Sequence, residues 1–109
     1  MKYCCTNSTK KGTCYHEFQK GKFEGSFWHE DSLLLHDDIL IHLNLENLFV
    51  SVIPHYTSYN ETEVTPNDWK EIYIKACEIG GETKVVIEEL NSWAEATFIS
   101  HGLFTILGI

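Results

Sequence analysis

Hydrophobic and polar residues alternate with a period of two through much of the first half of the chain. Every second residue from Ile39 to Leu45 is aliphatic, and polar residues fill several of the positions between. A strand with one buried face has this period. The pattern predicts strands at Ile39–Leu45 and Leu48–Tyr56, with turns at Asp37-Asp38 and Glu46-Asn47 before them.

Shorter apolar segments come before these two. Thr13–Gln19 and Phe23–Glu30 are rich in aromatic residues, and Lys20-Gly21-Lys22 between them is typical of a hairpin turn. Another apolar segment follows at Ser32–His36. We therefore expect an antiparallel meander over this half of the chain, preceded by a loosely ordered N-terminal segment at residues 1–12.

The period changes in the second half, after a polar and acidic segment at Thr57–Val64 that we expect to be a loop. Thr65, Pro66 and Asp68 then supply an N-cap, a first-position proline and a first-turn acid in the right order for a helix. Apolar residues recur at helical spacing up to Gly80-Gly81, where the glycines are expected to end the helix.

Residues 83–100 allow two interpretations. Val85–Ile87 is β-branched, which favours a strand, and Ser92 with Glu95 has the spacing of a capping box for a short helix. The alternative is one helix from Thr83 to Ser100, because the apolar positions also fit a helical face. We favour a strand and then a helix, since consecutive β-branched residues lose side-chain freedom in a helix. Leu103–Ile109 is expected to be a final strand.

The expected fold class is therefore α+β. An antiparallel β-meander would be followed by an α-helix, a strand, a short helix and a final strand, with the helices packed on one face of the sheet. A chain of 109 residues suits a single domain over residues 1–109. Neither an apolar leader nor an 18-residue apolar stretch is visible, so we expect a soluble, cytoplasmic protein.

The charge of the chain bears directly on its partners. Sixteen Asp and Glu stand against eight lysines and no arginine, for a formal net charge of −8. Residues 29–109 contain fourteen of the acids and only three of the lysines. Such a chain repels nucleic acids and anionic membranes and attracts basic surfaces. We therefore expect a basic protein partner, and neither a nucleic acid nor a membrane.

Acidic residues recur every three or four positions along the predicted helix, on the side opposite its apolar positions. A solvated helix face would have the same pattern. The functional interpretation is a surface that speeds association with a basic partner and sets its specificity. Two acids in the preceding loop would extend this stripe. The predicted partner-binding residues are Glu61, Glu63, Asp68, Glu71, Glu78 and Glu82.

Candidate chemistry is sparse. The chain has no phosphate-binding glycine loop, nucleophile elbow or His-Glu-x-x-His motif. His29-Glu30-Asp31 and His36-Asp37-Asp38 each place a base beside acids, as general acid–base catalysis requires. Both fall at predicted turns, however, where polar residues also gather for solvation alone. We therefore predict a protein without catalytic residues, with a small hydrolase as an alternative.

The cysteines of the N-terminal region invite a comparison with zinc sites. Cys4, Cys5, Cys14 and His16 are potential ligands, but structural zinc sites usually place two residues between paired cysteines. The other interpretation is a strand with small apolar thiols. We predict neither a metal nor a cofactor, and free thiols as in a reducing compartment.

In size, acidity and absence of catalytic motifs, including the acidic run from Glu61 to Glu82, the chain resembles bacterial immunity proteins that neutralise basic toxins such as nucleases. This resemblance implies an inhibitor that covers the active site of a toxin by acidic mimicry of nucleic acid. The predicted order of helix, Val85–Ile87 strand, short helix and final strand is also similar to regulatory STAS-like domains. That second likeness implies a regulatory domain. A regulatory or oligomer-forming domain is therefore the alternative function, and the apolar segment Leu103–Ile109 supports it as an exposed edge strand for a homodimer.

Overall fold

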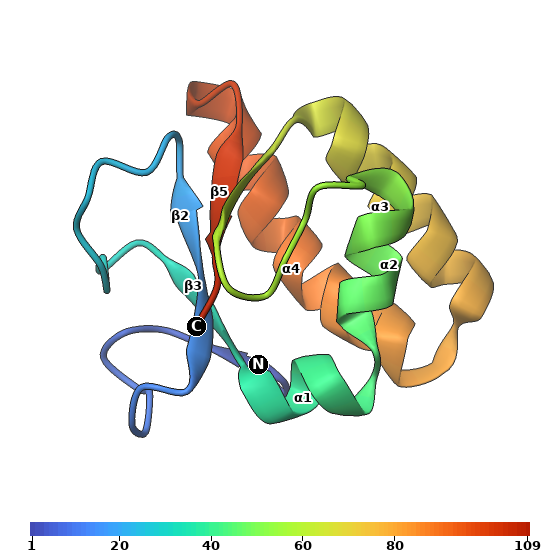
Figure 1. Cartoon of the computed structure of the whole chain (residues 1–109), viewed down its shortest axis with the longest axis horizontal. Coiled ribbons are helices and arrows are strands. Elements are labelled where there is room, and N and C mark those ends of the chain that lie inside the picture. Colours follow the sequence, from blue (N-terminus) through green and yellow to red (C-terminus); the bar gives the residue numbers. More distant parts are fainter.

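The computed structural model describes residues 1–109, and its fold is α+β, as predicted (Figure 1). The helices lie on one side of an antiparallel sheet, and the loops at residues 6–14 and 21–32 lie on the other side. The strands are β1 (Cys4–Cys5), β2 (Tyr15–Lys20), β3 (Leu33–His36), β4 (Glu61–Val64) and β5 (Phe104–Leu107). The helices are α1 (Asp37–His42), α2 (Leu45–Val52), α3 (Pro66–Ile79) and α4 (Gly81–Ser100).

The strand order in the sheet is β1-β3-β2-β5-β4, which is not a meander. Phe18 of β2 lies opposite Leu33 of β3 and Ile106 of β5, so these three residues share the face that the helices cover. The final strand was predicted correctly, but the expectation that it forms an exposed edge is wrong. Strand β5 is hydrogen-bonded to β2 on one side and to β4 on the other, so it has no free edge for a second chain.

The expected hairpin around Lys20-Gly21-Lys22 is also wrong, because Phe23–Glu30 forms no strand. Strand β2 pairs instead with β3 and β5. The intervening loop is held by the buried carboxylate of Glu17. The backbone N–H groups of Trp28 and His29 each donate to it at 2.8 Å, and the Ser32 hydroxyl donates at 2.7 Å.

The segments predicted as strands at Ile39–Leu45 and Leu48–Tyr56 are the helices α1 and α2. The Nδ1 atom of His36 accepts a hydrogen bond from the Asp38 N–H and thereby caps α1. Asn44 adopts a left-handed backbone (φ 52°) that separates the two helices. The alternation was misleading, since Ile41 is 65% exposed and Leu40, on the supposed polar face, is buried.

The polar segment at Thr57–Val64 was predicted as a loop, yet its second half is the edge strand β4. Thr62 and Val64 are buried, and Glu61 and Glu63 are exposed. This is the period-two pattern of a half-buried strand. The segment was predicted as a loop because the strand is short and two of its four residues are acidic.

Helix α3 begins and ends as predicted. The Thr65 hydroxyl accepts from the Asp68 N–H, and the Asp68 carboxylate accepts from the Thr65 N–H, both at 3.2 Å, which completes a capping box. Gly80 and Gly81 have positive φ values of 71° and 57° and form the corner between α3 and α4.

Residues 83–100 belong to the single helix α4, so the favoured strand-then-helix interpretation is wrong and the one-helix alternative is right. Val86 and Ile87 are buried, and Val85 is the exposed member of the β-branched run. Burial of two large side chains outweighs a helix propensity deficit of a few tenths of a kcal/mol per residue. The likeness to STAS-like domains fails with the Val85–Ile87 strand on which it depended.

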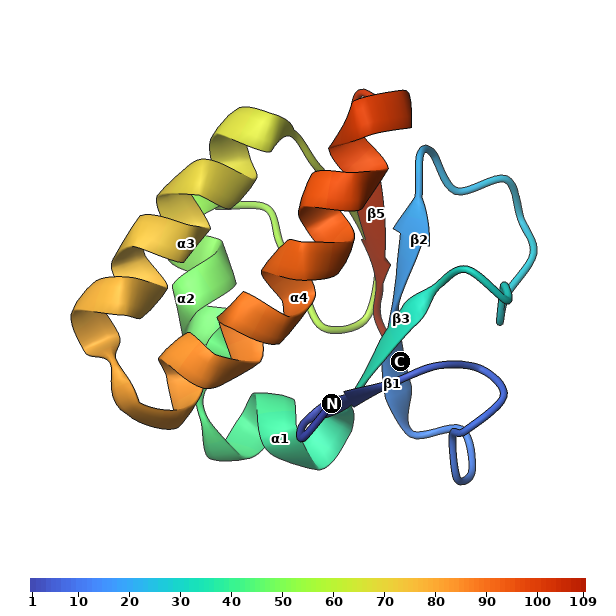
Figure 2. The same ribbon diagram turned by 180° about the vertical axis from the view of Figure 1, so that it is seen from behind.

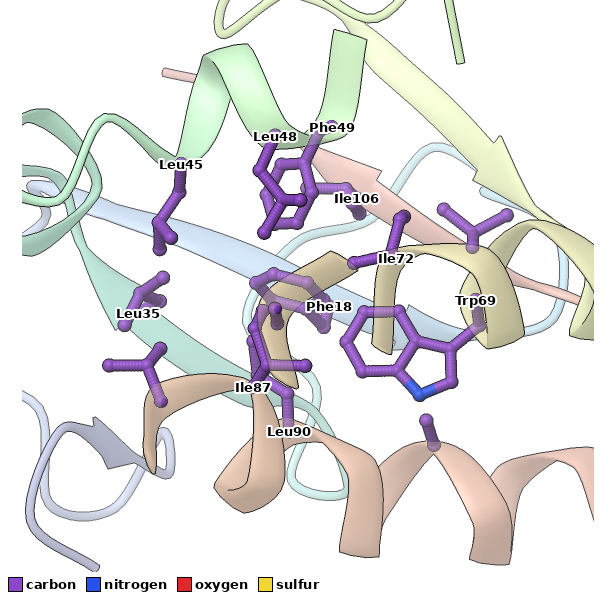
Figure 3. Packing of buried hydrophobic residues seen from close by; sticks show 14 of the residues in the cluster. Phe18, Leu35, Leu45, Leu48, Phe49, Trp69, Ile72, Ile87, Leu90 and Ile106 are labelled. Atoms are coloured by element: carbon purple, nitrogen blue, oxygen red, sulfur yellow. The ribbon is translucent and has the colours of Figure 1, made fainter. Parts of the chain in front are cut away.

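The core lies between the sheet and the helices (Figure 3). Phe18 and Ile106 project from the sheet, and α3 and α4 contribute Trp69 and Ile87 among others. Phe104 is fully buried and has four aromatic neighbours at ring-centroid distances of 5.3 to 6.0 Å. These neighbours are Phe18, Trp69, Trp93 and Phe98.

The N-terminal segment predicted to be loosely ordered contains the short edge strand β1, beside α4 in Figure 2. Cys4 and Cys5 pair with Leu35 and Leu34 of β3. The carboxylate of Glu89 on α4 accepts the backbone N–H groups of residues 2, 3 and 4 at 3.0 to 3.2 Å. None of the four helices combines the length and the apolar character needed to cross a bilayer.

Candidate functional site

The acidic side chains of the folded chain are not neutralised by its lysines. No lysine forms an ion pair with a carboxylate, and the three close contacts between a carboxylate and a basic side chain each involve a histidine, which is charged only when it is protonated. The pairs are His16–Asp37, His36–Asp38 and His42–Glu82. The surface carboxylates therefore keep their negative potential, which is what a basic partner would meet.

Two predicted site residues, Glu71 and Glu78, lie on the face of α3 that points away from the core. They are exposed and seven residues apart, which places them on one face of the helix. Lys75 and the half-exposed Ile74 lie between them. Asp68 is different, because its carboxylate is engaged in the capping box with Thr65.

Glu78 also borders a cleft of about 420 Å³ between α2 and α3. Asn47 and Ser51 of α2 face Lys75 and Glu78 of α3 across this cleft, and Ile79 lies at its rim with 62% of its surface exposed. Apolar surface beside an uncompensated carboxylate suits a partner that brings both a cationic group and an apolar one.

Glu82 lies past the corner at Gly80 and Gly81, on the first turn of α4. The hydroxyl of Tyr3 donates a hydrogen bond to its carboxylate at 2.9 Å, and His42 Nε2 is 3.9 Å from it. The hydrogen bond to this carboxylate raises the pKa of the Tyr3 hydroxyl, with smaller contributions from burial and from the charge of Glu82. Glu82 is thus partly engaged in holding the N-terminal segment.

Glu61 and Glu63 do not extend the helical stripe. Their neighbours Thr62 and Val64 point into the core, so the two carboxylates project from the opposite face of the sheet. The structure therefore divides the six predicted residues into two groups. Asp68, Glu71, Glu78 and Glu82 belong to the helical side, and Glu61 and Glu63 belong to the loop side.

A second hollow of about 650 Å³ lies on the loop side, beside Glu61. Its lining includes the aromatic residues Phe23, Phe27 and Tyr59, together with Leu107 at the end of β5 and the two residues that follow, Gly108 and Ile109. The sequence offered a weak signal for this site, since the aromatic residues at 23 and 27 were visible but were assigned to a strand.

The histidine groups considered for catalysis have structural partners. His29 Nε2 is 2.9 Å from the Ser26 hydroxyl, and the His29 backbone donates to Glu17. His36 caps α1, and its ring packs edge-on against Tyr15. These contacts hold the loop and the helix in place.

A buried histidine–aspartate pair was missed in the sequence. His16 Nε2 and Asp37 Oδ1 are 2.7 Å apart, and the His16 side chain is completely buried. The other ring nitrogen, Nδ1, has no hydrogen-bond partner. The available signal was position, because His16 shares the core-facing side of β2 with Phe18 and lies beside the end of β3, where Asp37 follows. The His16 ring is closed off from solvent, whereas 31% of the Asp37 side chain is exposed.

The cysteines are all free thiols. Burial raises the pKa of the Cys4 thiol, with the nearby Glu89 carboxylate as a second cause. No group of three or more His, Cys, Asp or Glu side chains is arranged to hold a metal ion.

No protein-family model matches the sequence, and neither a curated protein nor a solved structure shows significant similarity to this chain.

Proposed function

We propose that this protein is a small protein-binding domain that engages a basic partner, and that it acts as an inhibitor of the immunity type. In this role it would cover the active site of a basic toxin, such as a nuclease. The observation that carries the proposal is the absence of any lysine–carboxylate ion pair in a chain with a net charge of −8.

The helical side supports the proposal through its geometry. Glu71 and Glu78 lie on a capped helix of fourteen residues, so their positions are set before a partner arrives. The cleft beside Glu78 adds the exposed Ile79 and the amide of Asn47. Charges of this kind mainly speed association and make it depend on salt, and the apolar surface contributes to holding the complex.

The test begins with capture of a partner on the immobilised protein at low salt, followed by its identification. Association rates are then measured against ionic strength for the wild type and for the double variant Glu71→Lys/Glu78→Lys. Both residues are exposed, so the fold should persist. We expect association to slow roughly tenfold at low salt and to depend less on salt, because two carboxylates that attract a basic partner are replaced by lysines that repel it. The difference should be largest at low salt, since charges more than about 8 Å apart are strongly screened at physiological ionic strength.

The matched control is the double variant Glu88→Lys/Glu95→Lys. It changes the net charge by the same amount, and its exposed side chains are also seven residues apart on a helix, but they lie on α4. If both double variants slow association equally, the effect depends on the net charge alone and not on the position of Glu71 and Glu78. An acidic partner, or equal rates for wild type and the α3 variant at low salt, would contradict the proposal. For a partner with nuclease activity, the inhibitor role also predicts loss of that activity on stoichiometric binding.

A further inference from the structure

The hollow on the loop side gathers exposed apolar side chains to an unusual degree. Three of the nine large apolar residues that are exposed line this one hollow: Phe27 (58% exposed), Tyr59 (79%) and Ile109 (53%). The ring of Phe23 lies 5.2 Å from that of Phe27 and adds a second phenyl group. A volume of about 650 Å³ is within the range of sites that bind small groups.

The walls of the hollow are fixed by backbone contacts. The N–H groups of Gly108 and Ile109 donate to the carbonyls of Asn60 and Ser58, at 3.1 and 2.9 Å. This joins the end of the chain to the segment before β4, as the position of the C-terminus in Figure 1 shows. A Cβ atom at Gly108 would lie 2.4 Å from the Ser58 carbonyl oxygen, so the approach is as close as glycine allows.

A carboxylate stands beside these rings. Glu61 lines the hollow, and an adjoining hollow shares Glu61 and Phe23 and adds Glu63 and Lys22. Neither glutamate forms an ion pair, with Lys22 or with any other residue. Aromatic faces next to a free carboxylate form a site that attracts a cation twice, through the negative face of the rings and through the charge.

The same fold already places cations on aromatic rings elsewhere. Lys10 Nζ lies 4.7 Å from the centroid of the Trp28 ring, and Lys2 Nζ lies 5.3 Å from that of Tyr3. The rings of Phe23, Phe27 and Tyr59 carry no such cation from the chain itself. They are therefore free to accept one from outside.

We propose that this hollow binds a cationic side chain of a protein partner, and that arginine fits it best. A planar guanidinium can stack on the rings and donate two parallel hydrogen bonds to the Glu61 carboxylate. The proposal rests on the proposed function for its occupant, a basic protein, but it uses a surface separate from Glu71 and Glu78.

The probe is a blocked Gly-Arg-Gly peptide, titrated into the ¹⁵N-labelled protein and followed by amide chemical shifts. We expect shifts at the residues that line the hollow, and matched peptides with lysine, norleucine and glutamate in place of arginine provide the comparison. Binding should weaken from arginine to lysine to norleucine and be absent for glutamate. Equal binding of the norleucine peptide would show an apolar site and overturn the proposal.

Variants at exposed positions test the two kinds of attraction separately. Glu61→Gln and Tyr59→Ala should each weaken binding of the arginine peptide roughly two- to fivefold, the range expected for a cation–π contact or ion pair at an exposed site. Lys22→Gln should strengthen it, because a like charge is removed. Glu71→Gln is the matched control and should leave the affinity unchanged.

Two outcomes separate this inference from the proposed function. If the arginine peptide fails to shift the hollow while Glu71→Lys/Glu78→Lys still slows association with the basic partner, this inference is wrong and the proposed function stands. If choline shifts the hollow and the arginine peptide does not, the site recognises a small quaternary ammonium compound, and the commitment to a protein side chain is overturned.

Discussion

The two faces of the sheet are covered in different ways. The face toward the helices carries apolar side chains such as Phe18, Leu35 and Phe104, all fully buried. The face toward the loops buries the polar side chains of Glu17 and Gln19 from β2 and Thr105 from β5. Apolar burial is non-directional and tolerates adjustment, whereas hydrogen bonds demand particular partners in particular places.

The buried polar side chains on the loop side, those of Glu17, Gln19 and Thr105, all form hydrogen bonds with the loop at residues 21–32. Gln19 Nε2 donates to the Ser26 carbonyl at 2.9 Å, and the Thr105 hydroxyl donates to the Gly21 carbonyl at 2.8 Å. Together with the three bonds to Glu17, these contacts hold a segment that has no strand or helix of its own. The helical side thus supplies stability, and the loop side supplies the shape of the aromatic hollow.

The largest effect should come from the helical side. Phe104→Ala removes a ring that touches four other aromatic rings, so it should lower the free energy of unfolding by about 3–5 kcal/mol. Urea denaturation measures the change. Should this variant fail to fold, Phe104→Leu keeps most of the volume and should cost less than about 1.5 kcal/mol.

The control for this prediction is Phe27→Ala, which removes the same side chain from an exposed position on the loop side. It should change stability by less than about 0.5 kcal/mol. If Phe104→Ala and Phe27→Ala lower the free energy of unfolding by similar amounts, the two faces of the sheet do not differ in how strongly their side chains are packed.

The second effect belongs to the loop side. Glu17→Gln replaces one of two carboxylate oxygens by an NH₂ group, which cannot accept from the N–H of Trp28 or His29. We expect a loss of about 2 kcal/mol, because a buried donor is left without a partner. Faster amide hydrogen exchange should be confined to the loop at residues 21–32.

Glu24→Gln is the matched control, since Glu24 is exposed on the same loop and makes no hydrogen bond through its side chain. If the Trp28 and His29 amides exchange as slowly in the Glu17→Gln variant as in the wild type, the Glu17 carboxylate does not position the loop. Glu17→Gln should also weaken binding of the arginine peptide, because the loop supplies Phe23 and Phe27 to the walls of the hollow.

The structural features that could be predicted from the sequence are those formed by residues close together in the chain. Thr65, Pro66 and Asp68 correctly predict the start of α3, because a helix cap is formed by residues that are close in sequence. The helices α1 and α2 were missed because six and eight residues give too few turns to distinguish periods of 2 and 3.6. Helix α4 was misassigned because packing of Val86 and Ile87 on the sheet outweighs their local preference.

The same reasoning explains the outcome for the site. The spacing of Glu71 and Glu78 on one helix was visible in the sequence, because helical geometry relates residues seven apart. The position of Glu61 on the other face of the sheet was not visible, because it depends on how β4 pairs with β5, forty residues later. Pairing also brings His16 to Asp37 and Tyr59 to Ile109, and no local pattern encodes these contacts.

The smallest effect concerns a buried polar group on the helical side, the hydroxyl of Tyr56. Tyr56 is buried against Phe49, and its hydroxyl has no hydrogen-bond partner. Tyr56→Phe removes this hydroxyl and keeps the ring. We expect the free energy of unfolding to rise by up to about 1 kcal/mol, because an unsatisfied buried donor is removed.

The pH dependence of the free energy of unfolding provides a second test of the Tyr56→Phe prediction. Burial raises the pKa of Tyr56 in the folded state above its ordinary value of about 10, and the charges of Glu46 and Asp37 add to the shift. Above pH 10 the unfolded chain therefore loses this proton while the folded chain keeps it, so stability falls as the pH rises through that range. Tyr56→Phe should make the fall shallower in urea melts between pH 9 and about 11. Other groups, such as the Cys4 thiol, titrate in both proteins and cancel in the comparison. A Tyr56→Phe variant that is less stable than the wild type at pH 7, and whose stability falls with pH as steeply as that of the wild type, would mean that the Tyr56 hydroxyl has a hydrogen-bond partner in the folded chain.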